Sequence, residues 1–302
     1  MCTANRILAV RLPMMPRDTS ELGNISGGVI LSQIDLAAAI VSRRACSNMR
    51  IDRMVTRAMN EVEFTSPVQV GDVLCCYGSV QRIGNTSVTV LVEVEVDRNG
   101  EMIPVTQATA VFVALDKDGK PTPLCNDKTP PRKSRPKASK AKTPPKPDQV
   151  TAAPNPERIV ALKKVMMPNE TNGMGNIFGG LLMTYMDWAG SYVARRSCKN
   201  KVIARCVTRF MDKIEFKEPV HVNDVITCYG SVTKIGTTSV SVHVEVEADR
   251  GGQTIPVTQA ELVFVAVNAR GKKVAVSCAA RSGKSKTRSG KSQKKAGCDC
   301  KR

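Results

Sequence analysis

The chain has 302 residues, of which 42% are hydrophobic, and it carries a formal net charge of +18. This length predicts about two domains, and the apolar content is sufficient for each of them to have a buried core. No apolar run approaches the roughly 18 residues of a membrane-spanning helix, which argues against an integral membrane protein.

Most of the positive charge lies in two segments. Residues 125–157 carry a net charge of +5 and residues 270–302 carry +11, which leaves +2 for the remainder. Both segments are rich in Pro, Lys and Ser and have almost no large apolar side chains, so we expect a disordered linker over 125–157 and a disordered tail over 271–302. Either segment is a solvated tether or, alternatively, an arm that contacts nucleic acid or an anionic membrane.

The first residues and the cysteines indicate the compartment. The sequence begins MCTANRILAVRLPMMP, which lacks the basic region, apolar stretch and cleavage site of a secretory signal. The 11 cysteines include no CxxC pair with a second CxxC or HxxxH, so neither a structural zinc site nor a disulfide framework is predicted. We therefore expect a reducing compartment and a cytoplasmic protein, with the mitochondrion as the open alternative.

The chain contains the same sequence pattern twice. A shift of 152 residues places Gly23-Asn24-Ile25-Ser26-Gly27-Gly28 on Gly175-Asn176-Ile177-Phe178-Gly179-Gly180. The match runs without a gap from Arg6 to Leu124, with roughly half of the positions identical. This period is too long for a solenoid repeat, so each copy should be a small domain. We place the first domain at 1–124 and the second at 158–270.

Each copy is expected to contain an edge strand, one helix and then several long strands. The helix of the first copy is predicted over Val29–Arg44, since this segment is apolar on most faces, has no Pro or interior Gly and ends in two cations. A helix this apolar should be buried on nearly all sides. Four strand patterns follow, near Val55–Phe64, Asp72–Arg82, Ser87–Asp97 and Pro104–Leu115.

The alternation of side chains predicts how these strands pair. Ser87–Asp97 alternates apolar and polar residues, as a half-exposed antiparallel strand does. Ile83-Gly84-Asn85-Thr86 is typical of a hairpin turn before this strand, and Ile235-Gly236-Thr237-Thr238 repeats the turn in the second copy. The predicted fold class is α+β: two tandem domains, each with a central helix wrapped by an antiparallel sheet.

Two aspartates interrupt the apolar helices. Asp35 and Asp187 each lie seven residues, or two helical turns, beyond the second glycine of the repeated motif. A carboxylate among Ile, Leu, Ala, Met and Trp is costly to bury unless it has a partner or a function. Desolvation should raise its pKa, which suits a general base. The alternative is an aspartate on a solvated strip of the helix.

The glycine pairs Gly27-Gly28 and Gly179-Gly180 open these helices. Free N–H groups and the positive end of the helix dipole at this point can polarise a carbonyl group. Glycine would allow that carbonyl to approach the backbone closely. The alternative is that the glycines only make a tight turn from strand to helix, and the residues alone leave both interpretations open.

Both copies resemble a known family. The two glycine motifs, the aspartate in the middle of the following helix and the strand sequence GDVLCCYGSVQRIGNTS resemble acyl-CoA thioesterases of the hotdog fold, both the bacterial YciA-like enzymes and the tandem-hotdog cytosolic acyl-CoA hydrolases of animals. The resemblance covers both copies, roughly three quarters of the chain.

The resemblance implies a set of catalytic residues. In such enzymes an aspartate at this helix position activates water or attacks the thioester, the helix start binds the carbonyl, and the asparagine before the glycines binds the carbonyl or the water. Because the two helices run antiparallel in hotdog pairs, we expect Asn24 to act with Asp187 and Asn176 with Asp35. The implied catalytic residues are Asn24, Gly28, Asp35, Asn176, Gly180 and Asp187, with Ser26 opposite Phe178 as the chief difference between the two sites.

The resemblance also implies contacts to CoA. Two stretches in each copy would contact the pantetheine and the nucleotide, and the arginine in each is a candidate for phosphate binding. The implied CoA-binding residues are Arg57, Ala58, Met59, Thr86, Ser87, Val88, Arg209, Phe210, Met211, Thr238, Ser239 and Val240. From the residues alone, Thr86 and Ser87 fit ordinary turn chemistry equally well.

Other catalytic constellations are not predicted. The two histidines, His221 and His243, align with Gln69 and Leu91 and so belong to no duplicated mechanism; we expect both to be plain strand residues.

The predicted function is hydrolysis of fatty acyl-CoA to a free acid and CoA, without a metal or a separate cofactor. The alternative is a noncatalytic acyl-CoA-binding or regulatory module. The resemblance further implies a homotrimer of double hotdogs.

Overall fold

The computed structural model describes residues 6–19, 24–46, 53–124, 158–172, 175–200 and 202–276. The expected linker, 125–157, lies outside these ranges, as does the expected tail from residue 277 onward. The elements of the first copy are β1 (Ile7–Pro13), the 3-10 helix η1 (Pro16–Asp18), α1 (Gly27–Ala45), β2 (Arg53–Met59), β3 (Val62–Glu63), β4 (Val73–Ile83), β5 (Ser87–Arg98) and β6 (Glu101–Leu115).

The second copy repeats each of these elements 152 residues later. Its elements are β7 (Ile159–Val165), η2 (Pro168–Glu170), α2 (Gly179–Ser197), β8 (Arg205–Met211), β9 (Ile214–Glu215), β10 (Val225–Ile235), β11 (Ser239–Arg250) and β12 (Gln253–Val267). The predicted helix and the long strands are confirmed, with bounds that differ from the expected ones by a few residues.

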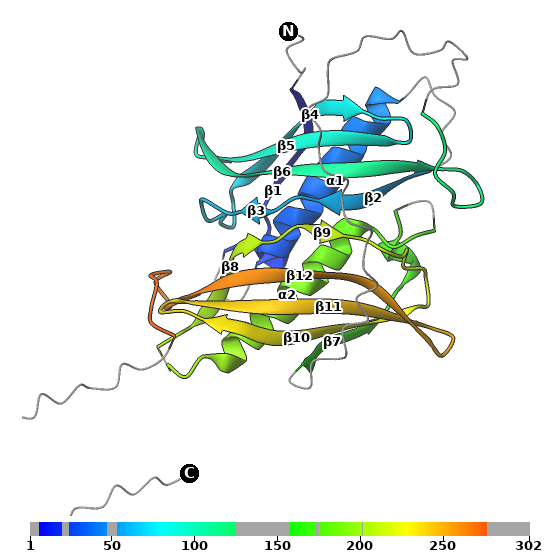
Figure 1. Cartoon of the computed structure of the whole chain (residues 1–302). Helices are drawn as coiled ribbons and strands as arrows, with labels where there is room; N and C mark the ends of the chain where they lie inside the picture. The colour runs from blue at the N-terminus through cyan, green and yellow to red at the C-terminus, as the bar shows by residue number, and fades with distance from the viewer. Residues whose placement is uncertain are drawn as a thin grey trace, which may run out of the picture.

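Each copy has one antiparallel sheet on which its helix packs. The strand orders are β1-β4-β5-β6-β2-β9 and β3-β8-β12-β11-β10-β7. Figure 1 shows the two sheets one above the other, with α1 and α2 behind them. The predicted fold class, a central helix wrapped by an antiparallel sheet in each of two tandem domains, is confirmed.

The core lies between each sheet and its helix. In β5, Val88, Val90, Val92, Val94 and Val96 are all buried and alternate with partly exposed residues, as predicted for a half-exposed strand. The helix contributes a second layer, because the apolar residues of α1 pack in the same cluster as these valines. Arg43 and Arg44 lie in the last turn of α1, where they face the negative end of the helix dipole.

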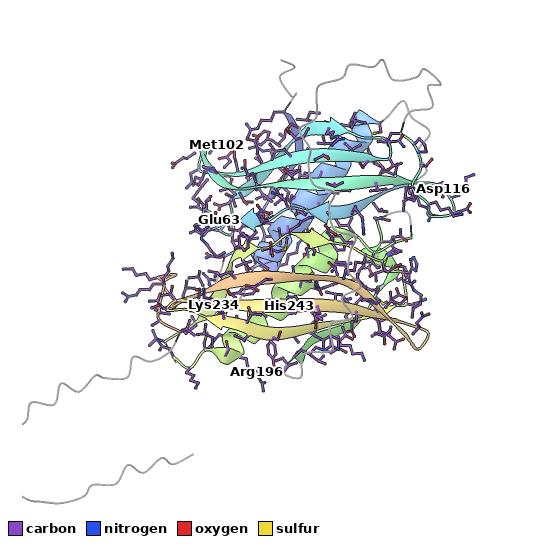
Figure 2. All side chains as sticks on the ribbon, viewed as in Figure 1. Glu63, Met102, Asp116, Arg196, Lys234 and His243 are labelled. Carbon is purple, nitrogen blue, oxygen red and sulfur yellow. The ribbon has the colours of Figure 1, made fainter. Side chains whose placement is uncertain are left out.

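The two copies exchange short strands at their interface. β3 of the first copy pairs with β8 of the second, and β9 of the second pairs with β2 of the first, both antiparallel. Each sheet therefore ends in a strand from the other copy. Glu63 in β3 marks this boundary in Figure 2, where it lies between the two sheets.

The second domain extends beyond its predicted end at residue 270, at least as far as Val276, the last residue of the described range. Lys273 forms an isolated bridge with Val267, and the Val276 N–H donates to the carbonyl of Thr237. Val276 is only 2% exposed. The basic residues at 270, 272 and 273 made this segment resemble the tail. In the 152-residue repeat, however, Val276 aligns with Leu124, which is also buried.

Within the described residues, neither helix has the length and the apolar character that crossing a membrane would require.

Candidate active site

Asp187 lies in the middle of α2 and contacts the start of α1. Its Oδ2 accepts hydrogen bonds from the Gly28 N–H (2.9 Å) and the Ser26 hydroxyl (2.7 Å), and its Oδ1 accepts one from the Thr208 hydroxyl. Ser26 is the N-cap residue of α1, yet it donates to Asp187 and makes no side-chain cap to its own helix. The carboxylate is 2% exposed and is held entirely by donors.

Asp35 has the corresponding position in α1 and contacts the start of α2. Its Oδ2 accepts a hydrogen bond from the Gly180 N–H (2.7 Å), and its Oδ1 accepts one from the Thr56 hydroxyl (2.8 Å). Phe178 replaces Ser26 at this site and has no hydroxyl to donate. Asp35 is fully buried, so each copy provides the carboxylate for the helix start of the other.

Burial perturbs both carboxylates in the direction that a general base requires. Desolvation raises the pKa of Asp35 to about 6, although the hydrogen bonds from Thr56 and Gly180 act in the opposite direction. Desolvation also raises the pKa of Asp187, against hydrogen bonds from Ser26, Thr208 and Gly28. A carboxylate that ionises near neutral pH can accept a proton efficiently and still release it.

The glycine pairs allow the two helices to approach each other. A Cβ atom on Gly28 would lie 2.7 Å from the Thr184 Cα and 2.8 Å from the Asp187 Cβ, and one on Gly180 would lie 2.8 Å from the Ser32 Cα. The opposite helix therefore fills the space that a Cβ atom on Gly28 or Gly180 would take, so the lack of a side chain serves the contact between the helices. Close helix contact is what brings each aspartate to the N–H of the other helix.

Two cavities flank the helix pair. The larger, about 1140 Å³, is lined by Asn176, Gly179 and Thr56, beside the Asp35 site. The smaller, about 620 Å³, is lined by Asn24 and Asp187. Asn24 thus shares a cavity with Asp187 of the other copy, whereas Asn176 lines the cavity whose Thr56 and Gly179 lie against the buried Asp35. Asn24 forms an isolated bridge with Gln69, and Asn176 forms one with His221.

The two histidines differ in their positions. His243 lies on β11, where Figure 2 labels it, and its Nε2 is 3.9 Å from Glu245. His221 lies between β9 and β10, outside the named strands, forms an isolated β-bridge with Asn176 and lines the larger cavity. Burial and the nearby Arg250 lower its pKa.

The candidate phosphate ligands Arg57 and Arg209 line the larger and the smaller cavity, respectively, and each also joins the two copies. Arg57 donates to the carbonyl of Phe216, and Arg209 donates to the carbonyl of Phe64. Arg209 also forms an ion pair with Glu63 at 2.7 Å. These contacts hold the exchanged strands together, which accounts for an arginine at this position in both copies.

The other candidate CoA-binding residues fall into two groups. Thr86 lines the larger cavity, and its carbonyl accepts a hydrogen bond from Ala114, as the carbonyl of Thr238 does from Ala266. Ser87 and Ser239 are partly buried at the same turns, and Ala58 and Phe210 are partly buried in β2 and β8. The remaining four have buried side chains in the core, where only their main chain could meet a ligand: Met59, Val88, Met211 and Val240.

The structure adds residues that the sequence analysis did not select. Thr56 and Thr208 bind the two aspartates, and both recur at the 152-residue shift, so the repeat could have identified them. Arg205 is a buried cation in the smaller cavity; it recurs as Arg53 at the same shift, but nothing in the sequence shows that its side chain is buried. Among the described residues, no three His, Cys, Asp or Glu side chains are grouped as a metal site would need.

The chain is similar to known thioesterases. The model of the thioesterase superfamily matches residues 22–103 and 174–255. An uncharacterised acyl-CoA thioester hydrolase of Haemophilus influenzae is 39% identical over 119 residues, which are 38% of this chain and 75% of that protein. The acyl-CoA thioester hydrolase YciA of Salmonella typhimurium is 38% identical over 122 residues, 39% of this chain and 89% of that one.

Solved structures extend the similarity. The hexameric thioesterase y2039 of Yersinia pestis is 36% identical, covers 41% of this chain and 98% of its own, and superposes with a TM-score of 0.38. The 12:0-ACP thioesterase of Umbellularia californica is only 10% identical but covers 85% of this chain and 93% of its own, with a TM-score of 0.57. The latter shares the fold over both copies.

Proposed function

Because this chain belongs to the thioesterase superfamily and is a tandem hotdog acyl-CoA thioester hydrolase, we propose that it hydrolyses fatty acyl-CoA at two composite sites. The observation that carries the proposal is the crossed arrangement of the buried carboxylates. Asp187 accepts a hydrogen bond from the Gly28 N–H, and Asp35 accepts one from the Gly180 N–H. Each site thus combines a base from one copy with a helix start from the other.

In the proposed mechanism the substrate carbonyl competes with the aspartate for the helix start. When the thioester oxygen takes the hydrogen bond of the Gly28 N–H, Oδ2 of Asp187 is released toward the attacking water. The aspartate accepts a proton from that water as the oxygen bonds to the carbonyl carbon. The C–S bond then breaks, the sulfur of CoA takes the proton from the carboxyl group, and a free acid remains. Asn24 and Asn176 would orient the carbonyl or the water, and no step requires a metal ion.

Single and double substitutions of the aspartates test this proposal. Release of thiol from palmitoyl-CoA should fall in both Asp35→Ala and Asp187→Ala and should disappear when the two changes are combined. If one single substitution abolishes all turnover and the other has no effect, only one site is competent. If the wild-type protein binds acyl-CoA without releasing thiol, the noncatalytic binding module is correct and the enzyme proposal fails. A series of substrates from acetyl- to palmitoyl-CoA would define the chain length that is preferred.

We also propose that three chains assemble into a homotrimer in the cytoplasm. In support, the edge strands β1 and β7 carry exposed apolar side chains at Leu8, Val160 and Val165, which a partner chain could cover. Light scattering should then give three times the 32.6 kDa mass of one chain. Truncation after Val276 should leave both hydrolysis and assembly intact, since it keeps Val276, which is buried in the second domain. Loss of activity on truncation would instead support a functional contact made by the basic tail.

A further inference from the structure

The asparagine at each site pairs with a short loop of its own copy. Asn24 forms a β-bridge with Gln69, and the next residue, Ile25, donates its N–H to the carbonyl of Val68 at 2.8 Å. Both partners belong to the loop between β3 and β4, and Val68 lines the smaller cavity together with Asn24. The position of Asn24 therefore depends on how rigidly this loop is held.

A buried ion pair closes this loop. Arg98, at the end of β5, donates from Nε to Oδ1 of Asp72 (2.8 Å) and from Nη2 to Oδ2 (2.7 Å), in the bidentate geometry of a strong charge-assisted pair. Its Nη2 also donates to the carbonyl of Pro67 at 3.0 Å. One guanidinium group thus contacts both ends of the segment from Pro67 to Asp72.

Asp72 extends this constraint to the residue that pairs with Asn24. Its Oδ2 accepts a hydrogen bond from the Gln69 N–H at 2.8 Å, and Asp72 is only 3% exposed. Burial acts to raise the pKa of Asp72, but the hydrogen bonds from Arg98 and Gln69 outweigh it and hold the pKa below its usual value. The group is therefore charged at neutral pH, and it connects Arg98 to the backbone that pairs with Asn24.

The second copy has the same contacts at the other site. Arg250 donates to Asp224 at 3.0 and 2.7 Å and to the carbonyl of Pro219 at 2.8 Å. Oδ2 of Asp224 accepts a hydrogen bond from the His221 N–H at 2.9 Å, and His221 forms the β-bridge with Asn176. The residue in the middle of the loop differs between the copies, but only its backbone takes part, so the arrangement is kept.

The ion pair is better suited to fixing a geometry than to adding stability. A buried ion pair gains little over well-packed apolar side chains, because both charges lose their water, whereas a bidentate guanidinium group orients its partner. We propose that Arg98 is a positioning residue of the hydrolysis, which acts through Asp72 to fix Asn24 at the smaller cavity. Arg250 has the same role at the larger cavity. Neither arginine lines a cavity, so each acts only through these contacts. This inference rests on the proposed function.

Because each site combines residues of both copies, the proposal predicts a crossed effect. Asn24 shares its cavity with Asp187, so Arg98 of the first copy should support the site whose carboxylate comes from the second. Arg250 should support the site of Asp35 in the same way. An arginine needed only for the folding of its own copy would not distinguish between the two sites.

Thiol release from palmitoyl-CoA in the two single-site backgrounds tests this effect. In Asp35→Ala, which leaves the site of Asp187, Arg98→Met should lower kcat about 10-fold and change KM less than about twofold. Arg250→Met should have this effect in Asp187→Ala instead. Arg11→Met, which breaks only an exposed ion pair, is the control and should change neither background. Equal losses from Arg98→Met in both backgrounds would assign the residue to the fold and overturn the inference.

A double-mutant cycle separates positioning from general destabilisation. In the Asp35→Ala background, Asn24→Ala removes the group that Arg98 positions, so adding Arg98→Met should lower kcat by less than about twofold further. Two losses that multiply in full would overturn the inference. Arg98→Lys keeps the charge beside Asp72 and lacks the planar fork, so it is the milder variant if Arg98→Met does not fold, and it should give the same crossed pattern at smaller amplitude.

Hydrogen exchange separates this inference from the proposed function, because it needs no turnover. The Ile25 N–H should exchange at least about 10-fold faster in Arg98→Met than in wild type, whereas the Ile177 N–H, which makes the same contact in the second copy, should keep its wild-type rate. Unchanged exchange at Ile25 would overturn the inference even if the protein is an active hydrolase. Faster exchange at Ile25 in a protein whose wild type releases no thiol would reject the hydrolase and support the constraint on Asn24.

Discussion

Replacement of Asp35 by Asn should abolish one site and stabilise the protein at the same time. Asp35 is fully buried in α1, and its pKa rises from 3.8 to about 6 because burial disfavours the charged form. At 1.36 kcal/mol for each tenfold change in ionisation, this rise corresponds to about 3 kcal/mol of folding free energy that is lost when the group ionises. An amide of the same shape can accept from Gly180 and donate to Thr56 without carrying charge.

The sign of the effect follows from the raised pKa. The contribution of Asp35 to stability is fully present below pH 3.8, where the group is protonated in both states, and it is lost as the pH rises through about 6. Asp35→Asn does not titrate, so it should match wild type near pH 4 and exceed it by about 3 kcal/mol above pH 7. With a urea slope of about 3 kcal/mol/M, the midpoint of unfolding should shift by about 1 M.

The assay is urea unfolding of both proteins from pH 4 to pH 8, alongside thiol release. Glu101→Gln serves as the control, because Glu101 is exposed on β6, lines neither cavity, and its replacement should not change the midpoint. In an Asp187→Ala background the remaining activity depends on Asp35, so its rate should fall about tenfold from pH 7 to pH 5. If the urea midpoint of Asp35→Asn is below that of wild type at every pH, the buried carboxylate does not lower the free energy of unfolding, and the reasoning is refuted.

Three further outcomes follow from particular contacts. Asp72 is buried and pairs with Arg98 at 2.7 Å, so Arg98→Met should destabilise the protein by about 3 kcal/mol in urea at pH 7. Arg11→Met breaks only an exposed pair and should cost less than about 1 kcal/mol. Equal effects of the two substitutions would contradict this expectation. Gly28→Ala should lower stability by about 1–3 kcal/mol and, in an Asp35→Ala background, abolish thiol release, because its Cβ would lie 2.7 Å from Thr184 and separate the helices. Dialysis against EDTA should leave kcat unchanged. If EDTA abolishes the activity and a divalent ion restores it, the mechanism in which the carboxylate alone activates water is rejected.

Periodicity and repetition predict the elements well because they report local preferences. The valines of β5 alternate in the sequence and in the core, and the apolar segment from Val29 to Arg44 is a helix. The 152-residue shift also places the aspartates and the helix starts correctly relative to each other, given an antiparallel pair. These features are visible in a sequence because each depends on a spacing that is fixed by strand or helix geometry.

Other features depend on contacts between distant residues and leave no local pattern. Arg57 and Arg209 each donate a hydrogen bond to a carbonyl group of the other copy, and no spacing in the sequence predicts these partners. The exchange of β3 and β9 is invisible because strands of two residues carry almost no pattern. Arg205 resembles any surface arginine in a strand, and only the burial of its guanidinium group reveals its unusual state.

The crossed sites constrain how the two copies can diverge. A duplicated domain is ordinarily free to change while its twin keeps the original activity, but in the mechanism that we propose each copy contributes half of both sites. The difference between Ser26 and Phe178 shows the consequence: a serine in the first copy alters the surroundings of the aspartate in the second. Specialisation of either site for a new substrate therefore requires matched substitutions in both halves of the gene, and loss of one copy would remove both activities together.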